Sequence, residues 1–224
     1  MIHFIANDYF RRGDPLAYRE TTKTITKKAE VKDKILLSAR NLILQGGFRV
    51  ASVSAIAEGA NIATGTVYRH FPSKSALFSE VFRAATELEV SKVAEAININ
   101  ASFTERLTSA VNCFSKRALK APQLAWALIA EPVDPVVDAD RLHYRQAYAD
   151  IFERLIEDGI KSGEIPSQDR CITAAALVGA MAESLVGPLS PSNKANTSIV
   201  DKDALINSIA QFCVQAVIGQ EYPL

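Results

Sequence analysis

One short segment of the chain, residues 64–70, places side chains suited to phosphates and base edges on a single helical face. Short hydroxyl groups and a phenol can hold phosphate oxygens, whereas arginine and threonine can read base edges or a thymine methyl group. None of the outward-facing residues is acidic. They are Thr64, Gly65, Thr66, Tyr68, Arg69 and His70. The segment therefore predicts a surface that binds double-stranded DNA.

Gly65 supports this interpretation. Glycine within a helix costs about 1 kcal/mol relative to alanine, and a helix this short tolerates it only when tertiary packing holds the helix in place. A backbone without a side chain also allows a neighbouring molecule to approach closely. DNA that offers its major groove to the helix is such a neighbour.

The flanking residues supply the frame of a helix-turn-helix over about residues 52–71. Ser52 is a good N-cap for a helix over 53–59, and the turn at 59–62 contains Asn61, which adopts the left-handed conformation readily. Pro72 ends the second helix of the pair. The alternative is a plain helical hairpin inside a bundle, but such a hairpin gives no reason to exclude acidic residues from its outer face.

Apolar spacing predicts how this pair packs. Ala63, Val67 and Phe71 recur at four-residue intervals and can face Ile56 and Ala57 on the preceding helix. A first helix over about 29–45 ends at a pair of glycines, and a longer helix starts after the cap Ser73. Lys74, at the start of that longer helix, is placed to meet a phosphate.

Charge is divided unevenly along the chain, although the formal net charge is zero. Residues 1–78 hold 12 Lys and Arg against 6 Asp and Glu, and the remainder holds 13 against 19. A basic first third is typical of contact with a nucleic acid or a membrane. The lysines of residues 23–34 either form an arm along phosphates or lie on a solvated tail.

The motif GTVYRHFPSK, with the upstream SVSAIAEGANIAT and the helix from Ile35 to Leu44, resembles the DNA-binding domain of the TetR (tetracycline-repressor) family. The resemblance implies that Tyr68, His70 and Lys74 contact phosphates and that Thr66 lies near both backbone and bases. It also implies base-edge contacts from Thr64, Gly65 and Arg69, and approach of Ser52 and Ser54 to the backbone or an outer base. The sequence departs from the family pattern at Asn61, where glycine is usual, at Ala63, where a serine cap is usual, and at Ser54, where some members carry a longer polar residue.

The remaining chain is predicted to be helical, near 102–120, 122–130, 139–162, 168–187 and 201–219, so the fold class is all-α. We expect a tail over 1–28, a DNA-binding domain over 29–82 and a C-terminal domain over 83–224. The resemblance implies that this C-terminal domain dimerises and binds an effector. Small residues of 168–187 and apolar residues of 201–219 suit a four-helix dimer interface, although an internal core remains the alternative. A dimer matches a near-palindromic operator with half-sites about 34–36 Å apart.

Candidate effector-pocket residues are aromatic or polar side chains on otherwise apolar helices, and ordinary core packing is the alternative for each. They are Phe114, Trp126, His143, Tyr144, Tyr148, Met181 and Glu183.

Other function classes find little support in the residues. Three widely spaced cysteines, Cys113, Cys171 and Cys213, favour a reducing compartment over a disulfide framework or a metal site. We identify no nucleophile–base pair, metal cluster or phosphate loop, and we predict neither an enzyme nor a cofactor. The N-terminus lacks a signal peptide, which favours the cytoplasm. We expect a repressor that an effector releases from its operator; the alternative is an activator or architectural DNA-binding protein without an effector.

Overall fold

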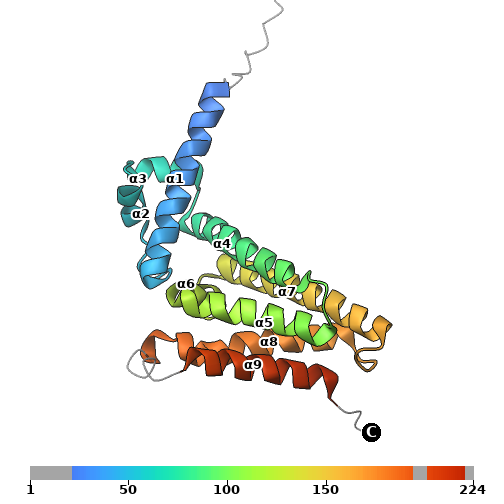
Figure 1. Cartoon of the computed structure of the whole chain (residues 1–224). Coiled ribbons are helices and arrows are strands. Elements are labelled where there is room, and N and C mark those ends of the chain that lie inside the picture. Colours follow the sequence, from blue (N-terminus) through green and yellow to red (C-terminus); the bar gives the residue numbers. More distant parts are fainter. Residues whose placement is uncertain (1–21, 194–200, 220–224) are drawn as a thin grey trace, which may run out of the picture.

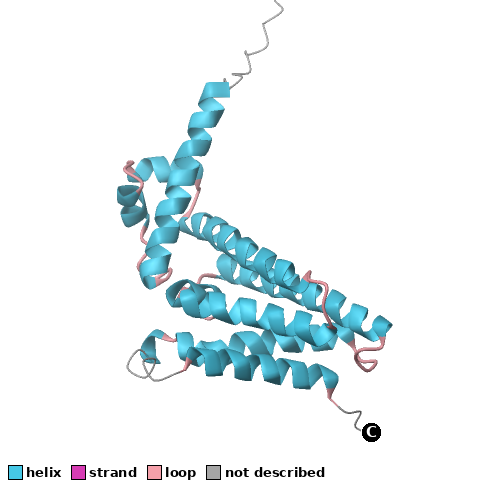
Figure 2. Ribbon diagram, viewed as in Figure 1, coloured by secondary structure: helices cyan, strands magenta, loops and turns pink. Residues whose placement is uncertain are grey.

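The structure is a computed structural model that describes residues 22–193 and 201–219. Within these two ranges it contains nine α-helices and one short 3-10 helix, and no strand (Figures 1 and 2). The helices are α1 (Thr22–Gly46), α2 (Val53–Gly59), α3 (Thr64–His70), α4 (Lys74–Ile97), α5 (Phe103–Lys120), α6 (Pro122–Ile129), α7 (Pro135–Ser162), α8 (Arg170–Leu189) and α9 (Lys202–Ile218); η1 is Pro191–Asn193. The all-α prediction is confirmed.

The first three helices form a small unit at one end of the molecule, with α2 and α3 beside the middle of α1 (Figure 1). Their shared core contains Ile35, Ile43, Ile56 and Val67, each at most 1% exposed. Helix α4 runs from this unit into the rest of the molecule. It passes through the predicted domain boundary at residue 82 without a break. The two parts of the chain are therefore joined by a continuous helix.

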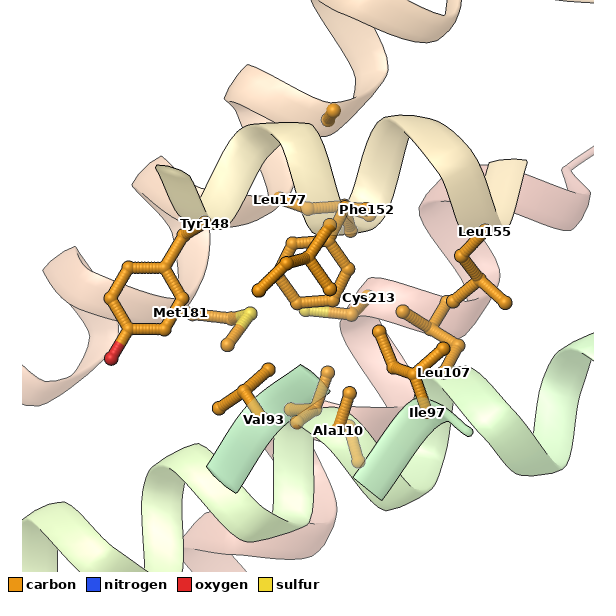
Figure 3. Close-up of a cluster of buried hydrophobic side chains, with 14 of the residues drawn as sticks. Val93, Ile97, Leu107, Ala110, Tyr148, Phe152, Leu155, Leu177, Met181 and Cys213 are labelled. Atoms are coloured by element: carbon orange, nitrogen blue, oxygen red, sulfur yellow. The ribbon is translucent and has the colours of Figure 1, made fainter. Parts of the chain in front are cut away.

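The C-terminal helices form a layered bundle in which α8 and α9 lie side by side, far from α2 and α3 (Figure 1). Phe152 of α7 lies at the centre of its core, among side chains from α4, α5, α8 and α9 (Figure 3). Tyr148 lies at the edge of this cluster, and its hydroxyl group points away from the other labelled side chains (Figure 3). The bundle thus has an apolar interior with a polar group at one end.

Local signals explain the ends of several helices. Ser102 and Glu105 form a reciprocal capping box at the start of α5. Asp134 accepts hydrogen bonds from Val136 and Val137, and Pro135 occupies the first turn of α7, so this helix starts four residues before the predicted 139. The connection between α6 and α7 therefore covers residues 130–134, whereas the predicted helix bounds leave residues 131–138 between the two helices.

Helix α1 begins at Thr22, seven residues before the predicted start at 29. Residues 22–28 contain neither glycine nor proline, and extending an existing helix costs far less than nucleating one. This part of the predicted tail is therefore helical, whereas residues 1–21 lie outside the described residues.

Helix α8 is long and apolar enough to cross a membrane by length and composition. A single such helix is weak support for a membrane protein, because core helices pass the same test. Here α8 packs extensively against α7 and also contacts α6 and α9. We therefore treat α8 as part of the bundle.

Candidate nucleic-acid interface

The helix-turn-helix has the predicted boundaries, with α2 over Val53–Gly59 and α3 over Thr64–His70. Ser52 caps α2 by accepting a hydrogen bond from the Ala55 N–H at 3.1 Å. Asn61 has a φ of 54°, as the turn prediction requires. Helix α3 starts at Thr64, and its N-cap Ala63 makes no side-chain capping hydrogen bond, which agrees with the departure noted in the sequence.

Packing fixes the inner side of α3. Val67 and Phe71 are 1% and 3% exposed, and both belong to the same core as Ile56. The prediction that Ala63 joins this stripe is wrong, because Ala63 is the N-cap, has an extended backbone and is exposed. Ile62, one residue earlier, packs against the core instead.

The opposite side of α3 faces solvent. Of the nine predicted DNA-contacting residues, Thr66 and His70 are half-buried and the other seven are exposed: Ser52, Ser54, Thr64, Gly65, Tyr68, Arg69 and Lys74. They lie on α2, on α3 and at the start of α4, which together form one end of the molecule. This acid-free set is hereafter called the α3 face. A Cβ added at Gly65 would meet nothing within 4 Å, so the backbone there is open to a large neighbour.

Two cations near the α3 face have partners within the protein. The Lys74 ammonium lies 4.9 Å from the centre of the Phe78 ring. Lys32 of α1 pairs with Glu80 and lies 5.7 Å from the Phe71 ring. The Phe78 ring therefore supports the side chain of Lys74, the first residue of α4, whereas Lys32 joins α1 to α4 through its pair with Glu80.

The C-terminal helices hold this unit through a buried carboxylate. Glu131, which follows α6 and is 7% exposed, accepts hydrogen bonds from the Phe48 N–H at 2.9 Å and the Arg49 N–H at 3.0 Å. Arg141 of α7 donates to the carbonyl oxygens of Glu131 at 2.7 Å and Leu128 at 3.1 Å. Sequence reasoning missed this joint, because Glu131 is separated from Phe48 by 83 residues and lies in a segment predicted to be loop.

A cavity lies between α4, α5, α6, α7 and α8, with about 810 Å³ of empty space, part of it open to solvent. Four predicted pocket residues line it: Phe114, Tyr144, Tyr148 and Met181. Three others do not, since Trp126 packs against the bundle core and His143 and Glu183 are exposed. Successive residues of an α-helix point about 100° apart, so Tyr144 lines the cavity whereas the adjacent His143 is exposed.

Polar groups are few among the cavity walls. Arg117 pairs with Glu89 through two hydrogen bonds, one of 2.8 Å, and the bond to Glu89 raises the pKa of this arginine. Burial raises the pKa of Tyr148 well above its usual range, so its hydroxyl stays protonated at neutral pH. Arg141 and Arg145 also line the cavity, and burial lowers the pKa of Arg141. The walls otherwise consist mainly of apolar side chains, a composition typical of a small-molecule site.

Comparison with known proteins agrees with both halves of this arrangement. Residues 35–81 match the family described as "Bacterial regulatory proteins, tetR family", and residues 100–185 match "Tetracyclin repressor-like, C-terminal domain". The chain belongs to the TetR family of transcriptional regulators. It is a DNA-binding transcriptional regulator, and the family is one of regulators and not of enzymes.

Several TetR-type relatives are similar over most of their length. The transcriptional regulator UidR of Escherichia coli is 25% identical over 68% of this chain and 79% of its own. The repressor KstR2 of Rhodococcus jostii is 26% identical over 62% of this chain and 70% of its own. The solved structure of the regulator FadR from Bacillus subtilis, in complex with stearoyl-CoA, shares the fold with a TM-score of 0.69 and 22% identity, covering 82% of this chain and 98% of that one.

The two last helices of this TetR-type chain leave an apolar surface uncovered. Ile172 of α8 is 68% exposed and Phe212 of α9 is 58% exposed. Helix α8 also exposes the small residues Ala175, Ala176 and Gly179. Other small residues of the predicted interface, such as Ala174 and Ala182, are buried within the bundle instead. Each helix packs internally on one side and exposes apolar residues on another, so an internal core accounts for only part of these two helices.

Proposed function

We propose that this protein is a homodimeric repressor that binds a near-palindromic operator and leaves it when a small molecule occupies the cavity. The α3 face is the observation that carries this proposal, because its seven exposed residues are polar or small, none of them is acidic, and they lie at one end of the molecule. In such a face Tyr68, His70 and Lys74 hold phosphates, and Thr64, Gly65 and Arg69 meet base edges. Thr66 serves both, and Ser52 and Ser54 approach the backbone.

Dimerisation through α8 and α9 places two α3 faces on one side of the assembly. The uncovered apolar surface of these helices, with Ile172 and Phe212, supports this, since such a patch on a folded protein marks an interaction site. A two-fold dimer reads two half-sites on successive turns of the duplex, about 34–36 Å apart. The proposed cellular location is the cytoplasm, where the chromosome is accessible to the protein.

The lining of the cavity favours an amphipathic effector with a long apolar portion and an anionic end. Apolar side chains from five helices would surround the apolar portion, and Arg145 at the exposed part of the lining would meet the anion. The relative in complex with stearoyl-CoA has the same fold, and its ligand has this chemistry. Repression is favoured over activation because KstR2, a named repressor, matches a larger share of this chain than the activator FasR of Mycolicibacterium smegmatis, which matches 49%.

Helix α4 offers one route from the cavity to the operator. Its residues Phe82, Thr86 and Glu89 line the cavity, and its first residue, Lys74, lies beside α3. A ligand that binds better to one tilt of α4 than to another shifts the population between the two arrangements. The separation of the two α3 faces changes with that tilt, and operator affinity changes with it.

Selection of DNA fragments by the purified protein, followed by sequencing, tests the proposal. We expect a near-palindromic site whose affinity falls steeply as salt concentration rises, because bound phosphates release counterions. Stearoyl-CoA and stearate are then added as probes, and either should lower that affinity. Recovery of sequences without symmetry, or affinity that does not depend on salt, would contradict the proposed operator binding. A symmetric site with no response to either probe would leave repression standing and refute the proposed effector class.

A further inference from the structure

The turn between α1 and α2 depends on a carboxylate from the C-terminal helices. Helix α1 ends at Gly46, and the next backbone N–H, that of Gly47, still bonds to the Ile43 carbonyl at 2.8 Å. The following two N–H groups, of Phe48 and Arg49, point instead at the two oxygens of Glu131. Phe48 is 4% exposed, and a buried N–H without an acceptor costs about 1–3 kcal/mol. Glu131 therefore satisfies donors that the turn cannot satisfy by itself.

Gly47 provides the space for this contact. Its φ of 77° lies in the left-handed region, and a Cβ at this position would come within 2.4 Å of a Glu131 oxygen. Only a residue without a side chain lets the carboxylate reach the turn at this distance. The two partners thus fit each other across a sequence separation of more than 80 residues.

The position of Glu131 is in turn fixed by the cavity wall. Arg141 grips the end of α6 through the carbonyl oxygens of Ala127, Leu128 and Glu131, and it lines the cavity itself. Leu124, Ala125 and Leu128 of α6 line the cavity as well. Helix α6 has only eight residues, with Pro122 at its first position and Pro132 three residues after its end. Any displacement of α6 by an occupant of the cavity moves Glu131.

We propose that Glu131 is a positioning residue that transmits occupancy of the cavity to the helix-turn-helix, by a route through α6 and α1 that is separate from α4. This rests on the proposed function, in which the cavity is the effector site. In the empty protein the Glu131 carboxylate holds the α1–α2 turn, and with it α2 and α3, in one orientation relative to the bundle. Pushing α6 outward carries the turn along or breaks its two hydrogen bonds, and either outcome reorients the α3 face.

A double-mutant cycle on the full-length protein tests this without a known effector. Ala118→Phe fills the cavity from α5, at a residue that belongs to the bundle core and not to the core of the N-terminal unit. Glu131→Gln keeps the side-chain shape but replaces one acceptor by a donor. The DNA is the fragment recovered by selection with the unaltered protein. We expect Ala118→Phe to lower operator affinity by about tenfold in the Glu131 background, within the range of measured allosteric couplings.

The same cavity-filling change should have little effect once Glu131 is replaced, with affinity changing within about twofold, as for uncoupled sites. An equal loss in both backgrounds would overturn the role of Glu131 and leave the cavity as effector site. No loss in either background would refute the coupling of the cavity to DNA, and with it the proposed function. Asp138→Asn is the matched control, because Asp138 bonds Arg141 at 2.8 Å and is exposed; it should leave the effect of Ala118→Phe intact.

A further measurement separates transmission of cavity occupancy from simple stabilisation of the turn. Amide hydrogen exchange of Phe48 and Arg49 should accelerate in Ala118→Phe while that of α9 stays unchanged, whereas a purely structural carboxylate would leave both unchanged. If thermal unfolding shows that the Ala118→Phe protein is not folded, Ala182→Phe takes its place in the cycle, because Ala182 lines the same cavity from α8. The same results are expected of Ala182→Phe, and the same results would contradict the proposal.

Discussion

The Tyr144 hydroxyl of α7 donates a hydrogen bond to a Glu87 oxygen of α4, with 2.8 Å between the two oxygen atoms. Tyr144 is 7% exposed, and its ring lies 6.2 Å from that of Phe82, also of α4. The same tyrosine lines the cavity. The Tyr144 side chain therefore contacts α4, belongs to the core of the N-terminal unit and lines the proposed effector site.

Ionisation of Tyr144 should destabilise the fold at high pH. Burial, followed by the hydrogen bond to Glu87, raises the pKa of Tyr144 from 10 to about 12. Because the folded-state pKa is the higher one, the stabilisation is fully present below pH 10 and is lost as pH rises through about 12. We expect the free energy of unfolding of the wild type to exceed that of Tyr144→Phe below pH 10, and this difference to shrink above it.

Urea unfolding of both proteins at several pH values measures this difference, and other titrating groups cancel because both proteins share them. A difference that stays constant through the alkaline range would show that the Tyr144 hydroxyl titrates as it does in the unfolded chain.

The helix-turn-helix could be predicted in detail because its signals are local. The cap Ser52, the turn residue Asn61 and the spacing of Val67 and Phe71 all act within a few residues of one another, and the structure confirms the boundaries of α2 and α3. Ala63 was assigned to the inner stripe because simple periodicity takes no account of the extended backbone of an N-cap.

The joint and the cavity could not be predicted in this way. Glu131 satisfies donors 82 and 83 residues away, and no local pattern around it shows which groups it meets. The cavity depends on how five helices pack, so neighbours on one helix, such as His143 and Tyr144, have opposite surroundings. Leu88 shows the same limit, since it continues the apolar spacing of α4 yet is 42% exposed.

Gly65→Ala should change stability and DNA affinity in opposite directions. The added Cβ meets nothing within 4 Å, so the free energy of unfolding should rise by up to about 1 kcal/mol through better helix propensity. Operator affinity should fall, because the methyl group occupies space that the duplex needs. Thermal unfolding and a binding titration on the selected fragment give the two quantities.

Gly47→Ala is the matched control for this change. Its backbone has a φ of 77° and its Cβ would meet Glu131, so this alanine should lower stability instead of raising it. Unchanged operator affinity in a stabilised Gly65→Ala protein would show that the duplex does not approach the backbone of α3.

Arg69→Ala and Lys74→Ala should weaken DNA binding in different ways. Arg69 is exposed on α3, and its loss should cost about 1–3 kcal/mol on the preferred site while relaxing the preference at one base position. Lys74 lies at the start of α4, and its loss should weaken all sequences alike and reduce the salt slope by about 1. Titrations of the selected and a scrambled fragment at several salt concentrations distinguish these effects. Identical, sequence-independent losses in both variants would contradict the assigned roles.

Phe212→Asp should convert the protein into a monomer. The phenyl ring is 58% exposed on α9, and a carboxylate in its place would be buried without a partner in the proposed dimer. Leu142→Asp is the matched control, since Leu142 is 62% exposed on α7, outside the two helices of the proposed interface, and its replacement should leave the dimer intact. Sedimentation velocity measures the assembly state. A monomer binds one half-site at a time, so the Phe212 variant should lose the advantage of the full operator over a half-site fragment. Dimers of both variants would instead place the subunit contact elsewhere and remove the reason for two α3 faces to meet one palindrome.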